Sequence, residues 1–199
     1  MPKSFVLPPL REFFDNATVA LALAEAKGDN ALVLVNQHFK TLTGYDDADV
    51  LGKNCRMLQQ GAGGERASNE EARAKIHSFL SRPTSSVIRT PIVNFRKDGR
   101  PFVNLLFMSK LSSSSGDVQY IFASQFDISR TRPDLLDKYN TDLGTTLTRI
   151  QPMLEGHNVI IEGSLATIAS SATTIAQAKV TLAELDKSDQ SQSGRTLRD

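Results

Sequence analysis

The sequence contains a single cysteine, Cys55, and only three histidines in 199 residues. One thiol cannot build an internal disulfide framework, and so few thiols and imidazoles predict no Cys- or His-based metal centre. The charges nearly cancel, with 23 Lys and Arg against 22 Asp and Glu. A net charge of +1 provides no long-range field that would gather nucleic acid or an anionic membrane. Direct nucleic-acid binding is therefore not expected.

Long apolar runs are also missing. No stretch approaches the roughly 18 consecutive apolar residues of a membrane-spanning helix, and the first residues lack the apolar core of a signal peptide. The chain is therefore expected to be cytoplasmic, with no membrane partner. Its 199 residues suit one domain of ordinary size plus an additional segment.

The composition changes along the chain and predicts four regions. Residues 1–16 form an N-terminal arm with a short cap helix, 17–130 a mixed domain, 131–185 a helical extension and 186–199 a polar, disordered tail. In the mixed domain, apolar runs predict strands at 19–26, 31–35, 87–95, 102–111 and 118–128. Helices are expected at 36–43, 46–51 and 68–80. This order predicts an α+β fold, with short helices on one face of a five-stranded antiparallel sheet.

Apolar residues recur every three or four positions in the extension, as in an amphipathic helix. Pro152 and Gly156 interrupt the repeat, so we expect two helices or one strongly kinked helix. The stripes must pack back onto the sheet or meet a second copy of the chain. The first stripe consists of Leu136, Tyr139, Leu143, Leu147, Ile150 and Leu154, and the second of Ile161, Leu165, Ile168, Ala172, Ile175 and Leu182.

The single cysteine lies in an informative motif, Gly52-Lys-Asn-Cys-Arg-Met-Leu-Gln59. Taken alone, a thiol beside Arg56 near a helix start could be a nucleophile with a low pKa, or an inert buried cysteine. Its surroundings favour a functional thiol. With Asn94-Phe-Arg-Lys-Asp-Gly99, Pro101-Phe-Val-Asn-Leu-Leu106 and Gln125-Phe-Asp-Ile128, the motif resembles the LOV family, the blue-light-sensing, flavin-binding branch of the PAS domains.

This resemblance covers residues 13–130 and implies the PAS/LOV fold, with FMN as the cofactor and FAD or riboflavin as alternatives. It further implies a short bacterial photoreceptor whose helical extensions stand in place of an effector domain. Residue chemistry supports it, because Asn94, Asn104 and Gln125 fall on three successive predicted strands. Side-chain amides offer both donors and acceptors, as the polar edge of a flavin ring requires.

The resemblance also implies roles for single residues. Cys55 would join flavin carbon C4a reversibly under blue light, and Gln125 would act as a hydrogen-bond switch at N5/O4. Arg56 and Gln59 would hold the ribityl phosphate. His77 replaces the family's second phosphate-binding arginine, so Arg73 or Arg66 is expected to compensate. The other expected cofactor contacts are Asn54, Leu58, Leu106 and Ile121.

The output of the extension stays open at this level. Residues 158–170 faintly resemble the dimerisation helix of HWE-type histidine kinases, but Val159 stands at the phosphoacceptor position. Only 14 residues, nearly all of them polar, follow Leu185, so autokinase activity is not expected. We favour a non-enzymatic photoreceptor that signals through rearrangement of a homodimer to an unidentified protein partner. The alternatives are a flavin-dependent redox sensor, a degenerate HWE-like dimerisation module regulated by light, and a PAS interaction module without cofactor.

Overall fold

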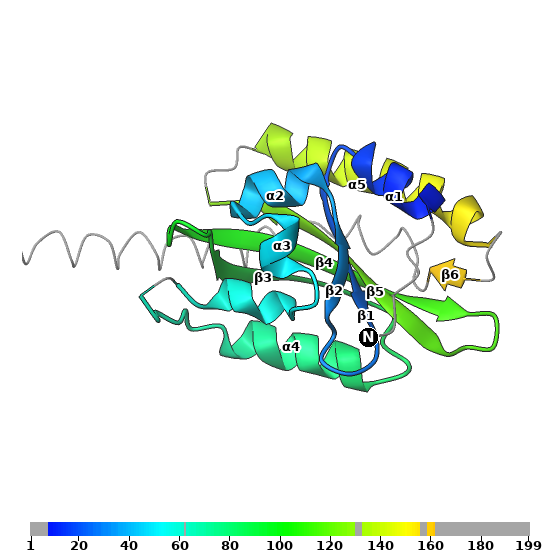
Figure 1. Ribbon diagram of the computed structural model, residues 1–199, viewed down its shortest axis with the longest axis horizontal. Helices are drawn as coiled ribbons and strands as arrows, with labels where there is room; N and C mark the ends of the chain where they lie inside the picture. Colours follow the sequence, from blue (N-terminus) through cyan, green and yellow to red (C-terminus); the bar gives the residue numbers. More distant parts are fainter. Residues whose placement is uncertain (1–7, 62, 130–132, 156–158, 162–199) are drawn as a thin grey trace, which may run out of the picture.

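The computed structural model describes residues 8–61, 63–129, 133–155 and 159–161 (Figure 1). Six strands and six helical segments lie in this part of the chain. In order they are α1 (Pro8–Asp15), β1 (Ala20–Glu25), β2 (Leu32–Val35), α2 (Gln37–Thr43), α3 (Asp47–Val50), the 3-10 helix η1 (Cys55–Gln59), α4 (Glu70–Ser81), β3 (Val87–Phe95), β4 (Pro101–Ser113), β5 (Val118–Asp127), α5 (Pro133–Glu155) and β6 (Val159–Ile161).

The strands form one antiparallel sheet in the order β2-β1-β5-β4-β3. The β3–β4 hairpin turns at Asp98-Gly99, as its sequence predicts, and Gly99 takes a φ of 85° that glycine adopts without strain. The turn sets the register, in which Phe95 faces Pro101 and Val87 faces Ser109. The predicted α+β fold with a five-stranded antiparallel sheet is confirmed.

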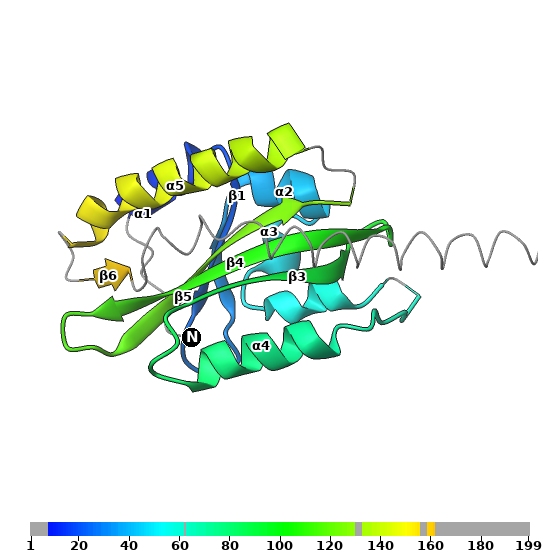
Figure 2. The same ribbon diagram turned by 180° about the vertical axis from the view of Figure 1, so that it is seen from behind.

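Helices cover both faces of the sheet (Figure 2). One apolar cluster joins α2, α3, η1 and α4 to the small side chains of β1, whereas a larger cluster joins α1 and α5 to the opposite face. Phe14 of α1 contacts Phe122 of β5 edge to face in the larger cluster, with ring centroids 6.0 Å apart. The sequence predicts short helices on one face, and the structure adds the cap helix and the extension on the other.

Asn36 holds the N-terminal part of the domain together. Its side chain is 1% exposed, and Oδ1 accepts from the N–H groups of Leu21 and Phe39, at 2.9 and 3.0 Å. Its Nδ2 donates to the carbonyls of Val19 and Phe14, at 2.8 and 3.1 Å. The residue caps α2 and fixes α1 and β1 beside it, because its four bonds join backbone groups of all three elements in a buried position.

The extension returns onto the sheet through the first apolar stripe. Every side chain of that stripe, from Leu136 to Leu154, is at most 7% exposed. Pro152 lies in the last turn of α5, and the helix ends at Glu155. Among the described residues no helix has the length and apolar character needed to cross a membrane.

A short strand follows where the sequence predicts only helix. Val159–Ile161 pair with residues 111–113 of β4. β4 extends past the end of its pairing with β3, and an unpaired sheet edge accepts a further strand. A helix beginning at residue 158, as in the HWE-like interpretation, is therefore wrong for residues 159–161. The rest of that string, the second apolar stripe after Ile161 and the polar tail lie outside the described residues.

Candidate functional site

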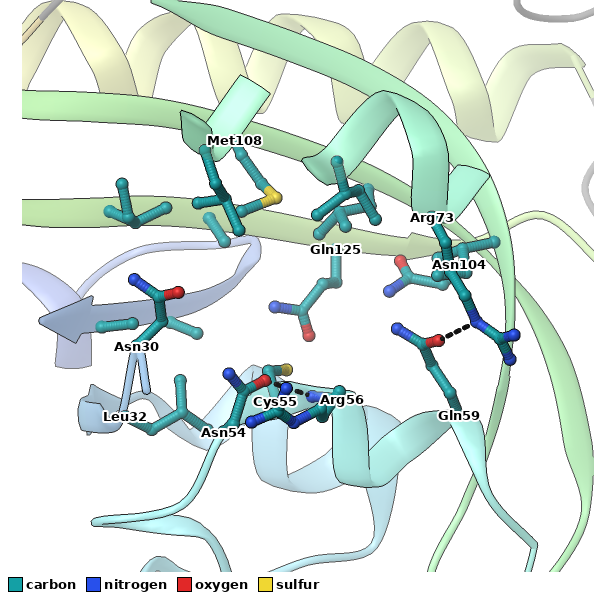
Figure 3. A pocket seen from close by; sticks show the side chains of 18 of the residues that line it. Asn30, Leu32, Asn54, Cys55, Arg56, Gln59, Arg73, Asn104, Met108 and Gln125 are labelled. Atoms are coloured by element: carbon teal, nitrogen blue, oxygen red, sulfur yellow. Dashed lines mark hydrogen bonds between the residues drawn. The ribbon is translucent and has the colours of Figure 1, made fainter. Parts of the chain in front are cut away.

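A pocket of about 470 Å³ lies between the sheet and the helices η1 and α4 (Figure 3). The sheet contributes one wall, and Cys55 at the start of η1 contributes the opposite one. Nearly all the residues that the sequence predicts for the site line this pocket together with Cys55. They are Asn54, Arg56, Gln59, Arg73, His77, Asn94, Asn104, Leu106, Ile121 and Gln125.

Leu58 is the exception among the predicted contacts. Its side chain is 1% exposed and belongs to the apolar cluster that contains Phe39 and Phe79. It is not among the residues that line the pocket, because its side chain packs in this cluster with Phe39 and Phe79. Contact of Leu58 with a cofactor therefore stays a prediction.

Three buried amides form the polar part of the sheet wall. Asn94, Asn104 and Gln125 lie on β3, β4 and β5, and each is at most 4% exposed. Nδ2 of Asn104 donates to Oδ1 of Asn94 at 2.9 Å, and Oδ1 of Asn104 accepts from the N–H of Phe126 at 3.3 Å. These bonds orient both asparagines and hold the three strands in register.

Gln125 differs from the two asparagines. It is 2% exposed, and within the part of the chain that the structure describes neither Nε2 nor Oε1 has a hydrogen-bond partner. A buried polar group without a partner costs about 1–3 kcal/mol. The amide projects from β5 into the pocket (Figure 3). A molecule that offers both a donor and an acceptor at this point would remove the cost.

Cys55 faces the sheet across the pocket (Figure 3). Asn54 caps η1, with Oδ1 accepting from the N–H of Arg56 at 2.8 Å, and this holds Cys55 at the first position of the helix. The half-buried thiol loses hydration, and burial raises its pKa to about 12. The sulfur is therefore a neutral thiol at neutral pH.

Arg56 does not activate this thiol, although the two residues are adjacent in sequence. Its guanidinium forms an ion pair with the carboxylate of Asp29, in the turn between β1 and β2. The interpretation of Cys55 as a nucleophile with a low pKa is wrong, because desolvation outweighs any charge effect at the sulfur.

The polar rim of the pocket carries two arginines and a histidine. Nε of Arg73 donates to Oε1 of Gln59 at 3.0 Å, so that α4 is connected to η1. Arg56 and His77 line the same pocket, whereas Arg66 is exposed and does not line it. Guanidinium groups match phosphate oxygens in shape and charge. Of the two arginines expected to compensate for His77, Arg73 is the one in place to do so.

The sequence analysis missed the small side chains that make room for the pocket. Ala22, Ala24 and Ala123 line it from β1 and β5, and Ala22 pairs with Ala123 across the two strands. The alternation of alanine with leucine along β1 contains this signal, since only every second residue faces the same side. Among the described residues no group of three or more His, Cys, Asp or Glu lies close enough to hold a metal ion.

The chain is similar to known sensory proteins. The profile of the PAS domain family matches residues 19–130. A blue-light-activated histidine kinase of Brucella anthropi is 36% identical over 100 residues, which are 50% of this chain and 19% of the kinase. Blue-light-activated histidine kinase 1 of Erythrobacter litoralis is 31% identical over 131 residues, 64% of this chain and 34% of the kinase. The chain thus spans a minor part of each curated relative.

Solved structures cover more of the chain. The d2 variant of RsLOV superposes with a TM-score of 0.68 at 29% identity, over 85% of this chain and 92% of the other. The LOV protein of Rhodobacter sphaeroides superposes with a TM-score of 0.63 at 32% identity, over 70% of this chain and 79% of the other. The similarity therefore includes elements outside the PAS match.

Proposed function

The chain belongs to the PAS domain family and, within it, to the LOV domains; from this premise we propose that it is a blue-light photoreceptor with a flavin in the pocket beneath Cys55. The observation that carries the proposal is the buried amide of Gln125, whose donor and acceptor both lack a protein partner among the described residues. The polar edge of a flavin ring supplies the complementary acceptor and donor.

The other pocket residues fit the same cofactor. Asn94 and Asn104 would bind the polar edge of the ring, and apolar side chains such as Leu106 and Ile121 would contact its faces. Arg56, Gln59, Arg73 and His77 would hold a phosphate, which favours FMN over riboflavin. FAD is the alternative, because the loop before α4 is long enough to accommodate a larger nucleotide.

When bound, a flavin supplies absorption of blue light and an electrophilic carbon, C4a. Cys55 would add its sulfur reversibly to that carbon and release its proton to N5. Because burial raises the pKa of Cys55 to about 12, the thiol is a poor nucleophile in the dark, and the addition would require excitation. Once N5 carries a proton, it becomes a hydrogen-bond donor. The amide of Gln125 would then rotate, so that its oxygen takes the place of its nitrogen at N5.

The signal would leave through the C-terminal extension. The first stripe of α5 covers the sheet. This stripe is therefore already occupied within the chain. Among the described residues, Leu135 is the one exposed large apolar side chain, with 43% of its surface accessible. We assign homodimer formation to the second stripe, after Ile161, and keep an unidentified protein as the downstream partner. The names of two relatives include histidine kinase activity, but the match covers only 19% and 34% of those proteins.

An absorption spectrum in darkness and under blue light tests the proposal. The purified protein should be yellow, bleach reversibly in the blue band, and release FMN on heating. Cys55→Ser changes a single atom and should retain the flavin but abolish the bleaching. Bleaching that persists unchanged in this variant would refute the thiol chemistry. A flavin that undergoes redox changes without thiol-dependent bleaching would favour the redox sensor, and colourless protein would favour a PAS module without cofactor.

A further inference from the structure

β5 presents different residues to the two faces of the sheet at the level of Gln125. Successive side chains of a strand point to opposite sides. Gln125 lines the pocket, whereas Ser124, which is fully buried, and Phe126 face the side that α5 covers (Figure 2). Whatever changes the position of Gln125 in the strand therefore also moves the two residues beside it.

A single residue of α5 contacts both of these neighbours. Oη of Tyr139 donates to Oγ of Ser124 at 3.1 Å. Its ring stacks on that of Phe126, with centroids 4.4 Å apart and an angle of 9° between the planes. Tyr139 is 4% exposed, and burial raises the pKa of its hydroxyl to about 12, so the group remains a donor at neutral pH.

The pocket also reaches Phe126 from its own side. Oδ1 of Asn104, whose side chain lines the pocket, accepts from the backbone N–H of Phe126 at 3.3 Å. Phe126 is thus bonded through its backbone to a pocket amide and stacked through its ring on α5. This is a continuous chain of contacts from the pocket to the helix.

The rest of the α5 interface has a different character. Leu143, Leu147, Ile150 and Leu154 belong to the apolar cluster, where contacts depend little on direction. The Tyr139 ring is also flanked by Arg89 of β3, whose guanidinium carbon lies 5.8 Å from the ring centroid. Arg89 donates in turn to Oδ1 of Asn140, so β3 and β5 together define the position of this part of α5.

We propose that Tyr139 is the positioning residue through which the state of the flavin pocket controls the docking of α5. Rotation of the Gln125 amide or a shift of Asn104 displaces residues 124–126 of β5, the bond to Ser124 and the stack on Phe126 weaken, and α5 docks less tightly in the light. The inference rests on the proposed function, since it needs a light-driven change in the pocket.

Hydrogen–deuterium exchange of the full chain in darkness and under blue light tests this role. In the unaltered protein, amides of α5 should exchange about five-fold or more faster in the light, the lower end of ordinary coupling between two sites. Tyr139→Phe retains the ring but removes the hydroxyl. It should raise the exchange in the dark and bring the light-to-dark ratio close to one, while the flavin still bleaches. Ser124→Ala, which removes the acceptor, should do the same.

Ile150→Val is the matched control, because it removes one methylene from the apolar contact of the same helix. A purely structural loss should raise exchange in both light states and leave their ratio unchanged. If Tyr139→Phe and Ser124→Ala bleach normally and retain the full ratio, Tyr139 does not couple the two sites. If the unaltered protein does not bleach, the proposed function fails first, and this inference fails with it.

Discussion

Nδ2 of Asn104 donates to Oδ1 of Asn94 over 2.9 Å, and this bond determines what the two amides can still offer a cofactor. Asn104 also accepts from Phe126, and Nδ2 of Asn94 donates to the carbonyl of Val93 at 3.2 Å. A primary amide has two N–H groups and two lone pairs. Each asparagine therefore retains one donor and one acceptor for the pocket, a pattern suited to the alternating edge of a flavin.

Replacing Asn104 should weaken flavin binding strongly. Asn104→Leu has a similar volume, but it removes the donor and the acceptor that Asn104 would offer the flavin, together with the bond to Asn94. A lost hydrogen bond that leaves a buried partner unsatisfied costs about 1–3 kcal/mol, so we expect a dissociation constant roughly 5- to 150-fold higher. Fluorescence titration of the flavin into apoprotein measures this effect. Gln119→Leu alters an exposed amide of β5 and should leave binding unchanged. Equal affinities for the two variants would contradict the assignment.

The thiol of Cys55 should be unreactive in the dark. Burial raises its pKa to about 12, against an ordinary value of 9.0. At pH 8 the thiolate fraction should therefore be lower than in the unfolded chain by roughly two to three orders of magnitude. The rate of alkylation by iodoacetamide, in buffer and in denaturing urea, measures this difference. Comparable rates in the two solvents would show that the thiol is not desolvated.

The same shift predicts the direction of a pH effect on stability. Between pH 9 and 12 the unfolded chain releases the thiol proton, whereas the folded chain retains it. The unfolded state then binds fewer protons, so the free energy of unfolding falls as the pH rises. The slope from this group is at most about 1.4 kcal/mol per pH unit. Urea titrations between pH 8 and pH 10 should show a smaller decline for Cys55→Ala than for the unaltered protein.

Arg73 should distinguish FMN from riboflavin. Its guanidinium lines the pocket and is held by Gln59, so it is placed for a phosphate rather than for the ring. Hydrogen bonds to charged groups contribute about 1.5–3 kcal/mol. Arg73→Gln should therefore raise the dissociation constant for FMN by at least ten-fold and leave that for riboflavin nearly unchanged. Arg66→Gln is the matched control, because Arg66 is exposed outside the pocket. An equal loss for both flavins would assign Arg73 to the ring or to the fold.

Local sequence patterns predict most of the helices and strands. The strand β6 is the exception, and its cause is non-local. The Asp98-Gly99 turn between two apolar runs predicts the β3–β4 hairpin, and its register brings Asn94 beside Asn104. β6 is different, because Val159–Ile161 lie in a string with helical spacing. They form a strand because β4 continues beyond its pairing with β3. Residues 111–113 of β4 therefore have a free edge, with which β6 pairs. That edge is formed by residues almost fifty positions away, and no local pattern reports it.

The same distinction holds in the pocket. Amides inside apolar strands are visible in sequence, and Asn94, Asn104 and Gln125 do line one pocket. The electrostatics of Cys55 were not visible, because the partner of Arg56 is Asp29, 27 positions earlier. Neighbours in sequence thus left a low-pKa thiol open as one of two alternatives, whereas burial raises the pKa of Cys55.

The oligomeric state should depend on residues after β6. The first apolar stripe is buried against the sheet and is not free to meet a second copy, whereas the second stripe continues after Ile161. We therefore expect the full chain to be a dimer in at least one light state, with an apparent mass about two and a half times that of a chain truncated after Ile161. Because the pocket is built from residues between Ala22 and Gln125, the truncated chain should bleach and recover like the full one. Light scattering and size exclusion in darkness and under blue light measure the masses. A full chain that is monomeric in both states, or a truncated chain that still dimerises, would exclude the second stripe as the interface.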